Sequence, residues 1–105
     1  MVYTIYQLDF SKDSVKNNPH KAFAGWDETT NDYGRVNIED YKVVYEGETN
    51  LDEKLDDIDI LENLFSKFNM RRPEDFLGHS LSVSDIVSLN GVLYYCDNFG
   101  WKEIV

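Results

Sequence analysis

The sequence predicts an α+β fold: a small antiparallel or mixed sheet, one main amphipathic helix packed on it, and a C-terminal β-hairpin. Three observations carry this prediction. Residues 2–10 alternate between two faces like a strand, apolar residues recur every three or four positions over 51–68, and Asn90-Gly91 separates two β-rich segments. A chain of 105 residues is too short for two independent cores, so residues 1–105 are expected to form a single domain.

The N-terminal half is expected to contain two strands joined mainly by loops. In residues 2–10, Tyr3 and Ile5 lie on one side of the strand, and Tyr6 and Leu8 lie on the other. The polar residues 11–19 and 29–34 have loop compositions. The β-branched and aromatic segment 41–45 is a second strand, which the residues Glu46-Gly47-Glu48 close.

The pattern over residues 51–68 predicts the longest helix. Its apolar positions form one stripe at helical spacing: Leu51, Leu55, Ile58, Leu61, Leu64, Phe65 and Phe68. Asn50 is the expected N-cap, and Glu53 stands three residues later, as in a capping box. The helix is therefore expected to begin at residue 51 and to bury this stripe against the sheet.

The C-terminal third is expected to form a helical turn and then the hairpin. Residues 73–78 begin with proline and end with glycine, which is typical of a single helical turn. Asn90-Gly91 is typical of a two-residue type I′ turn. This turn predicts three cross-strand pairs: Leu89 with Val92, Val87 with Tyr94, and Ile86 with Tyr95. Leu81 and Val83 are expected to extend the first strand of the hairpin, and residues 102–105 are expected to add a short edge strand.

The charge is concentrated in one part of the chain. Residues 27–62 contain thirteen acids and three bases, and the rest of the chain contains seven of each, so this segment carries the whole net charge of −10. An excess of acids repels phosphate backbones and anionic lipids, which argues against direct nucleic-acid binding and against membrane association. The chain starts without a basic or long apolar segment and contains one cysteine, Cys96, so we expect a cytoplasmic protein.

No residue pattern indicates catalysis or a cofactor. Cys96, His20 and His79 are candidates for nucleophile and base, but none of them stands in a recognisable motif, and Cys96 lies among tyrosines in a strand. Two dispersed histidines do not make a zinc site, and Asp56-Asp57-Ile58-Asp59 lacks the glycine of a calcium loop. We therefore expect a protein that is not an enzyme and that has no metal or cofactor.

The acidic segment is the candidate partner-binding surface. Solvation and the helix dipole explain part of the charge, but not the acids that precede the helix. Carboxylates at helical spacing lie about 5–6 Å apart, on the scale of a phosphate backbone, so the surface could bind a basic groove in place of nucleic acid. The predicted partner-binding residues are Glu46, Glu48, Asp52, Glu53, Asp56, Asp57, Asp59 and Glu62.

The chain resembles the YodL-like domain family over nearly its whole length. The most specific part of the resemblance is Gly78-His79-Ser80-Leu81-Ser82-Val83-Ser84-Asp85. Further segments that carry it are 3–8, 41–47, 61–69 and 94–103. The resemblance implies a domain found on plasmids and integrative elements of Gram-positive bacteria, without an established enzymatic activity.

A stand-alone chain of this size is also similar to small anti-CRISPR proteins of such elements. This similarity implies a protein partner, the type II CRISPR effector nuclease, whose basic RNA-binding groove the acidic surface would occupy so that guide RNA loading or function fails. Two alternatives remain open: a DNA mimic that inhibits a restriction enzyme or repressor, and a non-catalytic protein-interaction module. The sequence leaves the oligomeric state open.

Overall fold

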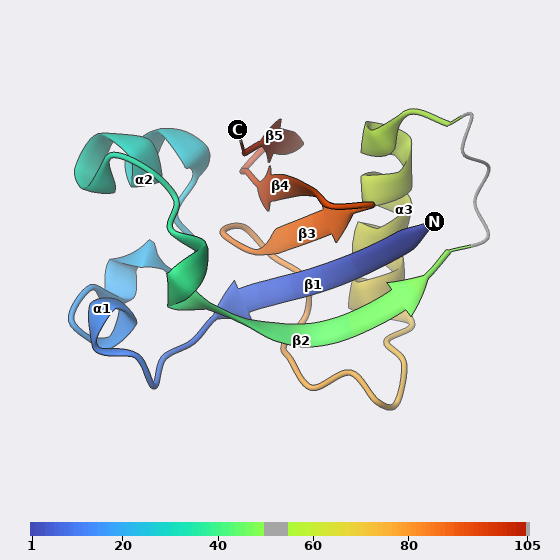
Figure 1. The fold of residues 1–105 in the computed structure, drawn as a ribbon, viewed down its shortest axis with the longest axis horizontal. Coiled ribbons are helices and arrows are strands. Elements are labelled where there is room, and N and C mark those ends of the chain that lie inside the picture. Colours follow the sequence, from blue (N-terminus) through green and yellow to red (C-terminus); the bar gives the residue numbers. More distant parts are fainter. Residues whose placement is uncertain (50–54, 105) are drawn as a thin grey trace.

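The protein folds around one five-stranded antiparallel sheet, seen here in a computed structural model that describes residues 1–49 and 55–104 (Figure 1). The strand order is β2-β1-β3-β4-β5. The strands are β1 (Val2–Leu8), β2 (Tyr41–Glu48), β3 (Ile86–Leu89), β4 (Val92–Cys96) and β5 (Trp101–Glu103). The predicted α+β class is confirmed, and of the two sheet types expected the antiparallel one is present.

The alternation of β1 separates two hydrophobic cores. Tyr3 and Ile5 join the core on one face of the sheet, and Leu8 joins the core on the other, with Tyr6 packed against it. The pairing with β2 shifts between Ile5 and Tyr6, where a β-bulge adds one residue to β2. The predicted two-sided strand is therefore confirmed, and it has a buried face on each side.

The β3–β4 hairpin forms as predicted. Asn90 and Gly91 both have positive φ, 47° and 89°, as a type I′ turn requires. The three predicted cross-strand pairs are all present. Asn90 also ties the hairpin to β1, because its Oδ1 accepts a hydrogen bond from the Val2 N–H at 3.1 Å.

One face of the sheet is covered by α3 (Asp57–Met70), drawn behind the strands in Figure 1. This helix begins six residues later than the pattern predicts. Asp56 is the N-cap and has an extended backbone, so Leu55 lies outside the helix. Ile58 lies in the first turn and is exposed. Ile60 takes the buried position. The Asp56 side chain makes no capping hydrogen bond, so the extended backbone at this residue marks where the helix begins. The predicted cap and capping box, Asn50 and Glu53, fall outside the described residues.

Val2 and Val43 on the second face of the sheet are exposed. The end of this face that is remote from α3 is covered by short helices that the sequence did not predict (Figure 1). They are α1 (Asp13–Lys16), η1 (Pro19–Lys21), α2 (Trp26–Tyr33) and η2 (Ile38–Asp40). Val15 and Trp26 pack from them toward Ile86 and Tyr95 of the sheet. These helices are short and rich in Asp, Asn and Thr, so their local composition resembles that of loops, and packing against the sheet stabilises them.

Two C-terminal predictions are corrected. Residues 73–78 form a turn instead of a helical turn, with the Phe76 N–H donating to the Pro73 carbonyl at 3.1 Å. β3 begins only at Ile86, because Ser84 has a positive φ of 84° that interrupts an extended strand. Leu81 is nevertheless buried in the core beneath α3. The predicted edge strand is present as β5, one residue earlier than expected.

A membrane span is not found in the described part of the chain, where no helix combines the necessary length and apolar character.

Candidate functional site

The outer face of α3 carries the predicted acidic residues that lie closest together. Asp56, Asp59 and Glu62 follow one another at spacings of three residues, and all three are exposed. Residues at this spacing are neighbours on a helix surface. Between residues 55 and 66 the helix and its N-cap carry no Lys or Arg. Figure 1 places this helix at one end of the molecule, on the side of the sheet away from the viewer.

Two carboxylates of this helix also fix its position on the sheet. Asp57 accepts a hydrogen bond from the Tyr94 hydroxyl, and Glu62 accepts one from the Trp101 indole N–H at 3.1 Å. Burial, and then the bond to Asp57, raise the pKa of Tyr94 to about 12, so its hydroxyl keeps its proton at neutral pH. Asp57 is half-buried and therefore has a structural role, whereas Asp56 and Asp59 extend into solvent.

Glu46 and Glu48 lie on the opposite side of the sheet. In the β1–β2 register they pair with Thr4 and Val2, which alternate with the residues that pack under α3. Side chains of directly paired residues share a face, so these two carboxylates point away from α3. Asp52 and Glu53 lie outside the described residues. The structure thus brings together Asp56, Asp57, Asp59 and Glu62, and it separates Glu46 and Glu48 from them.

The remaining acids of segment 27–62 are spread over the other end of the molecule. Asp27, Glu28 and Asp32 are exposed on α2, which Figure 1 shows at the end of the sheet remote from α3. Asp40 is buried and forms an ion pair with Lys21 at 3.0 Å. Burial would raise the pKa of Asp40, but hydrogen bonds from Ser14 and Lys21 hold it below its usual value. The acidic segment is therefore continuous in sequence and divided in space.

The residues of the Gly78–Asp85 motif build a buried polar cluster with Gln7 of β1. Asp85 Oδ2 accepts hydrogen bonds from Gln7 Nε2 at 3.0 Å and from the Ser82 N–H at 2.9 Å. Gln7 Oε1 in turn accepts from the His79 N–H at 3.2 Å. A Cβ at Gly78 would lie 2.1 Å from this oxygen, so the position needs glycine. The motif anchors the loop before β3 to the interior strand β1.

Two of the nucleophile and base candidates, Cys96 and His79, have defined surroundings in the structure. Cys96 is buried in the core beneath α3, and burial raises the pKa of its thiol to about 12, which disfavours the reactive thiolate. His79 Nδ1 lies 2.7 Å from the Ser80 carbonyl oxygen and 3.3 Å from Gln7 Nε2. Within residues 1–49 and 55–104, no three His, Cys, Asp or Glu side chains are grouped so that they could hold a metal ion.

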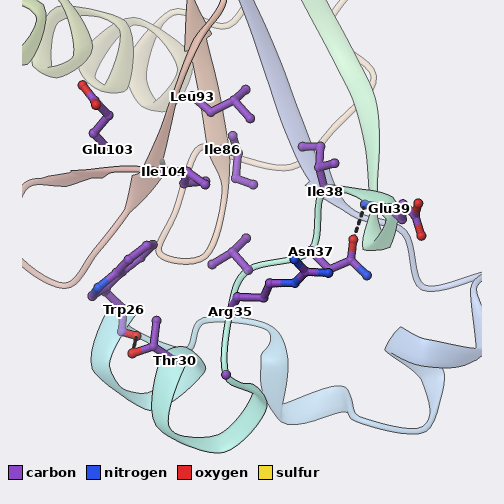
Figure 2. Close-up of a pocket in the computed structure, with 12 residues that line it drawn as sticks. Trp26, Thr30, Arg35, Asn37, Ile38, Glu39, Ile86, Leu93, Glu103 and Ile104 are labelled. Atoms are coloured by element: carbon purple, nitrogen blue, oxygen red, sulfur yellow. Dashed lines mark hydrogen bonds between the residues drawn. The ribbon is translucent and has the colours of Figure 1, made fainter.

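A groove of about 510 Å³ lies on the sheet face opposite α3 (Figure 2). Ile86, Leu93 and Ile104 contribute from the sheet side, and Trp26 contributes from α2. Sequence reasoning missed this groove because it treated residues 29–34 as a loop. The apolar residues Val36 and Ile38, close behind the helix, were the signal that could have indicated a packed wall.

Comparisons with known proteins identify the domain. The family model described as YodL-like domain matches residues 2–105. A search of curated proteins and a search of solved structures each find no significant match. The match covers all five strands and α3, including the Gly78–Asp85 cluster that ties the loop before β3 to Gln7. The chain therefore belongs to the YodL-like domain family.

Proposed function

We propose that this protein is an acidic, non-catalytic inhibitor from a mobile genetic element. Its target is a type II CRISPR effector nuclease, and it binds the basic nucleic-acid groove of that nuclease so that guide RNA loading or function fails. The observation that carries the proposal is the outer face of α3, where Asp56, Asp59 and Glu62 are exposed and no Lys or Arg lies nearby on the helix.

Electrostatics make this face suited to a basic groove. Successive carboxylates at three-residue spacing are about 5–6 Å apart and present a row of negative charges to a partner. Asp56 and Asp59 have no ion pair among the described residues, where the ion pair found joins Lys21 to Asp40. Their charges are therefore available to lysines and arginines of a partner, which accelerates association and makes it sensitive to salt.

The proposed contact is smaller than the full acidic segment. Glu46 and Glu48 face the other side of the sheet and contribute long-range attraction, not contacts shared with α3. Asp57 is held by Tyr94 and fixes the orientation of the helix. Because α3 is anchored to β4 and β5 through Asp57 and Glu62, its charged face is presented without rearrangement, which limits the entropy lost on binding.

The test is a binding titration against a purified type II effector, with and without guide RNA loaded. The variant Asp56→Asn/Asp59→Asn/Glu62→Gln removes three charges, and it keeps an oxygen acceptor for the Trp101 N–H. The matched control, Asp27→Asn/Glu28→Gln/Asp32→Asn, removes three charges from α2 at the other end of the molecule. We expect the α3 variant to bind the guide-free effector about 10-fold or more weakly, with a flatter salt dependence, and the control to lose about threefold or less.

Each other outcome counts against part of the proposal. Equal losses in both variants would show that net charge acts without a defined surface, and unchanged affinity in the α3 variant would overturn the α3 contact. Absence of binding to both forms of the effector would overturn the target. In that case a restriction enzyme and a DNA-binding repressor are the next proteins to titrate, because a DNA mimic would use the same charges.

A further inference from the structure

The groove opposite α3 has an apolar interior built from three regions of the chain. Ile86, Leu93 and Ile104 come from the strands or the residue after β5. Trp26 and Ile38 come from the segment that covers this face. The volume of about 510 Å³ is within the range of about 300–1,000 Å³ that small-molecule sites occupy. The groove therefore has room for a small molecule with about three aromatic rings.

Two polar side chains beside this groove, Arg35 and Asn37, carry hydrogen-bond donors. Arg35 extends beside the groove, and its guanidinium lies next to the Asn37 side chain (Figure 2). Asn37 Oδ1 already accepts a hydrogen bond from the Glu39 N–H at 3.1 Å, and its Nδ2 is directed away from Ile86 and Leu93 (Figure 2), so the Arg35 guanidinium is the donor left for a ligand. Arg35 is exposed and forms no ion pair within the described part of the chain.

The acidic residues of the groove are turned away from it. Figure 2 shows the carboxylate of Glu103 directed away from Trp26 and Ile104, and that of Glu39 directed away from Ile86 and Leu93. The charge that remains beside the apolar interior is the Arg35 guanidinium. Arg35 is one of only three bases among the thirteen acids of residues 27–62, so this positive group stands in an otherwise negative region.

From this arrangement we infer that the groove is a binding site for a small organic anion, with an apolar ring body and one carboxylate or sulfonate group. The rings would lie against Leu93, Ile104 and Trp26, which are partly exposed, and the anionic group would accept hydrogen bonds from Arg35. Apolar burial supplies affinity, and the guanidinium selects the charged ligand over its neutral analogue. The site lies on the opposite sheet face from α3 and is independent of the proposed partner contact.

Two fluorescent probes with the same rings test this site. The probe 8-anilinonaphthalene-1-sulfonate carries the anionic group, and N-phenyl-1-naphthylamine lacks it. We expect the sulfonate to bind at one site per chain and Arg35→Gln to weaken it about 10-fold while changing the affinity of the neutral probe by less than about twofold. Lys42→Gln, an exposed site on β2 that is not part of the groove, makes the same charge change and is expected to alter neither affinity.

A second variant tests the apolar contact without disturbing a core residue. Ile38 is 40% exposed, and Ile38→Asn is expected to weaken both probes. Amide chemical-shift changes on adding the sulfonate should centre on residues of the groove. Equal effects of Arg35→Gln and Lys42→Gln would overturn the site, as would binding that Arg35→Gln leaves unchanged, or shift changes centred on α3. Circular dichroism confirms that each variant is folded before titration.

Discussion

Asp85 is a buried acid that directly precedes β3, the central strand of the sheet. Its environment disfavours the charged form of its carboxyl group. Burial raises its pKa to about 7, although the hydrogen bonds from Ser82 and Gln7 and the nearby His79 favour the charged form. The unfolded chain has the ordinary value near 3.8. The folded state therefore keeps this proton over a pH range in which the unfolded state loses it.

This difference makes the stability of the protein depend on pH. Between about pH 4 and pH 7 the native state binds one proton more than the unfolded state, so the free energy of unfolding falls as pH rises, by at most about 1.4 kcal/mol per pH unit from this group. Asp85→Asn keeps an oxygen acceptor and cannot ionise. We expect urea unfolding to show that this variant loses less stability than the native chain between pH 5 and pH 8.

The control for this experiment is Asp32→Asn, an exposed acid on α2. It is expected to retain the pH dependence of the native chain. His79 is present in all three proteins, so the comparison isolates Asp85. Parallel pH profiles for native protein and Asp85→Asn would contradict a raised pKa at this position.

At the scale of elements, α3 shows where periodicity in the sequence succeeds and where it fails. Leu61, Leu64 and Phe68 are buried as the pattern predicts. Ile58 belongs to the predicted stripe, but it lies in the first turn of the helix and is 44% exposed. Ile60 is absent from the predicted stripe and is fully buried, although it stands four residues before Leu64 and eight before Phe68. Ile58 and Ile60 lie about 200° apart around a helix, so only one of them can share the buried face, and the i, i+4 spacing selects Ile60.

Two matched substitutions check this register. Ile60→Val removes a methylene from the core and is expected to lower the free energy of unfolding by about 0.5–1.5 kcal/mol. Ile58→Val makes the same chemical change on the exposed side and is expected to cost less than about 0.5 kcal/mol. Urea unfolding of both variants measures the difference. A larger loss for Ile58→Val would contradict the position of the helix face.

Other elements differ in how far local sequence determines them. Asn90-Gly91 suits a type I′ turn by itself, so the hairpin and its register could be predicted from a few residues. The helix α2 could not, because eight residues with a mean composition close to that of a loop become helical only when Trp26 packs against Tyr95. The alternating apolar pattern likewise predicts a strand that starts at Leu81. The positive φ of Ser84 interrupts it, so β3 starts only at Ile86.

At the scale of the whole molecule, the fold decides which of the acidic residues share a surface. The sequence correctly marks an acidic helix, but the separation of Glu46 from Asp59 depends on the pairing of β2 with β1 and on the bulge beside Ile5. A shift of one residue would turn Glu46 to the other face. The groove beside Arg35 was also beyond sequence reasoning, because its lining comes from three regions that only the fold brings together.

The net charge of the whole chain affects stability as well as binding. The chain has twenty acids and ten bases, so repulsion among the carboxylates exceeds attraction between opposite charges and lowers the free energy of unfolding. Screening by salt reduces this repulsion. We expect the melting temperature to rise by about 2–6 °C between roughly 0.02 M and 0.3 M NaCl, corresponding to about 0.5–1 kcal/mol for a domain of this size. Thermal unfolding followed by circular dichroism measures it.

The α2 variant Asp27→Asn/Glu28→Gln/Asp32→Asn provides the comparison, since it reduces the net charge without touching a buried residue. Its melting temperature should rise less with salt than that of the native chain. A melting temperature that falls with salt in the native protein would show that attractive pairs outweigh the repulsion.

The position of β1 in the sheet has a consequence for how the protein is made. The strand is synthesised first, yet it lies between β2 and β3, and Tyr3 pairs with Leu89 near the other end of the chain. On the ribosome, β1 can meet β2 well before β3 emerges, so one edge of this interior strand stays unpaired until residues 86–89 have been synthesised. A nascent chain that stops before residue 86 has no native partner for that edge.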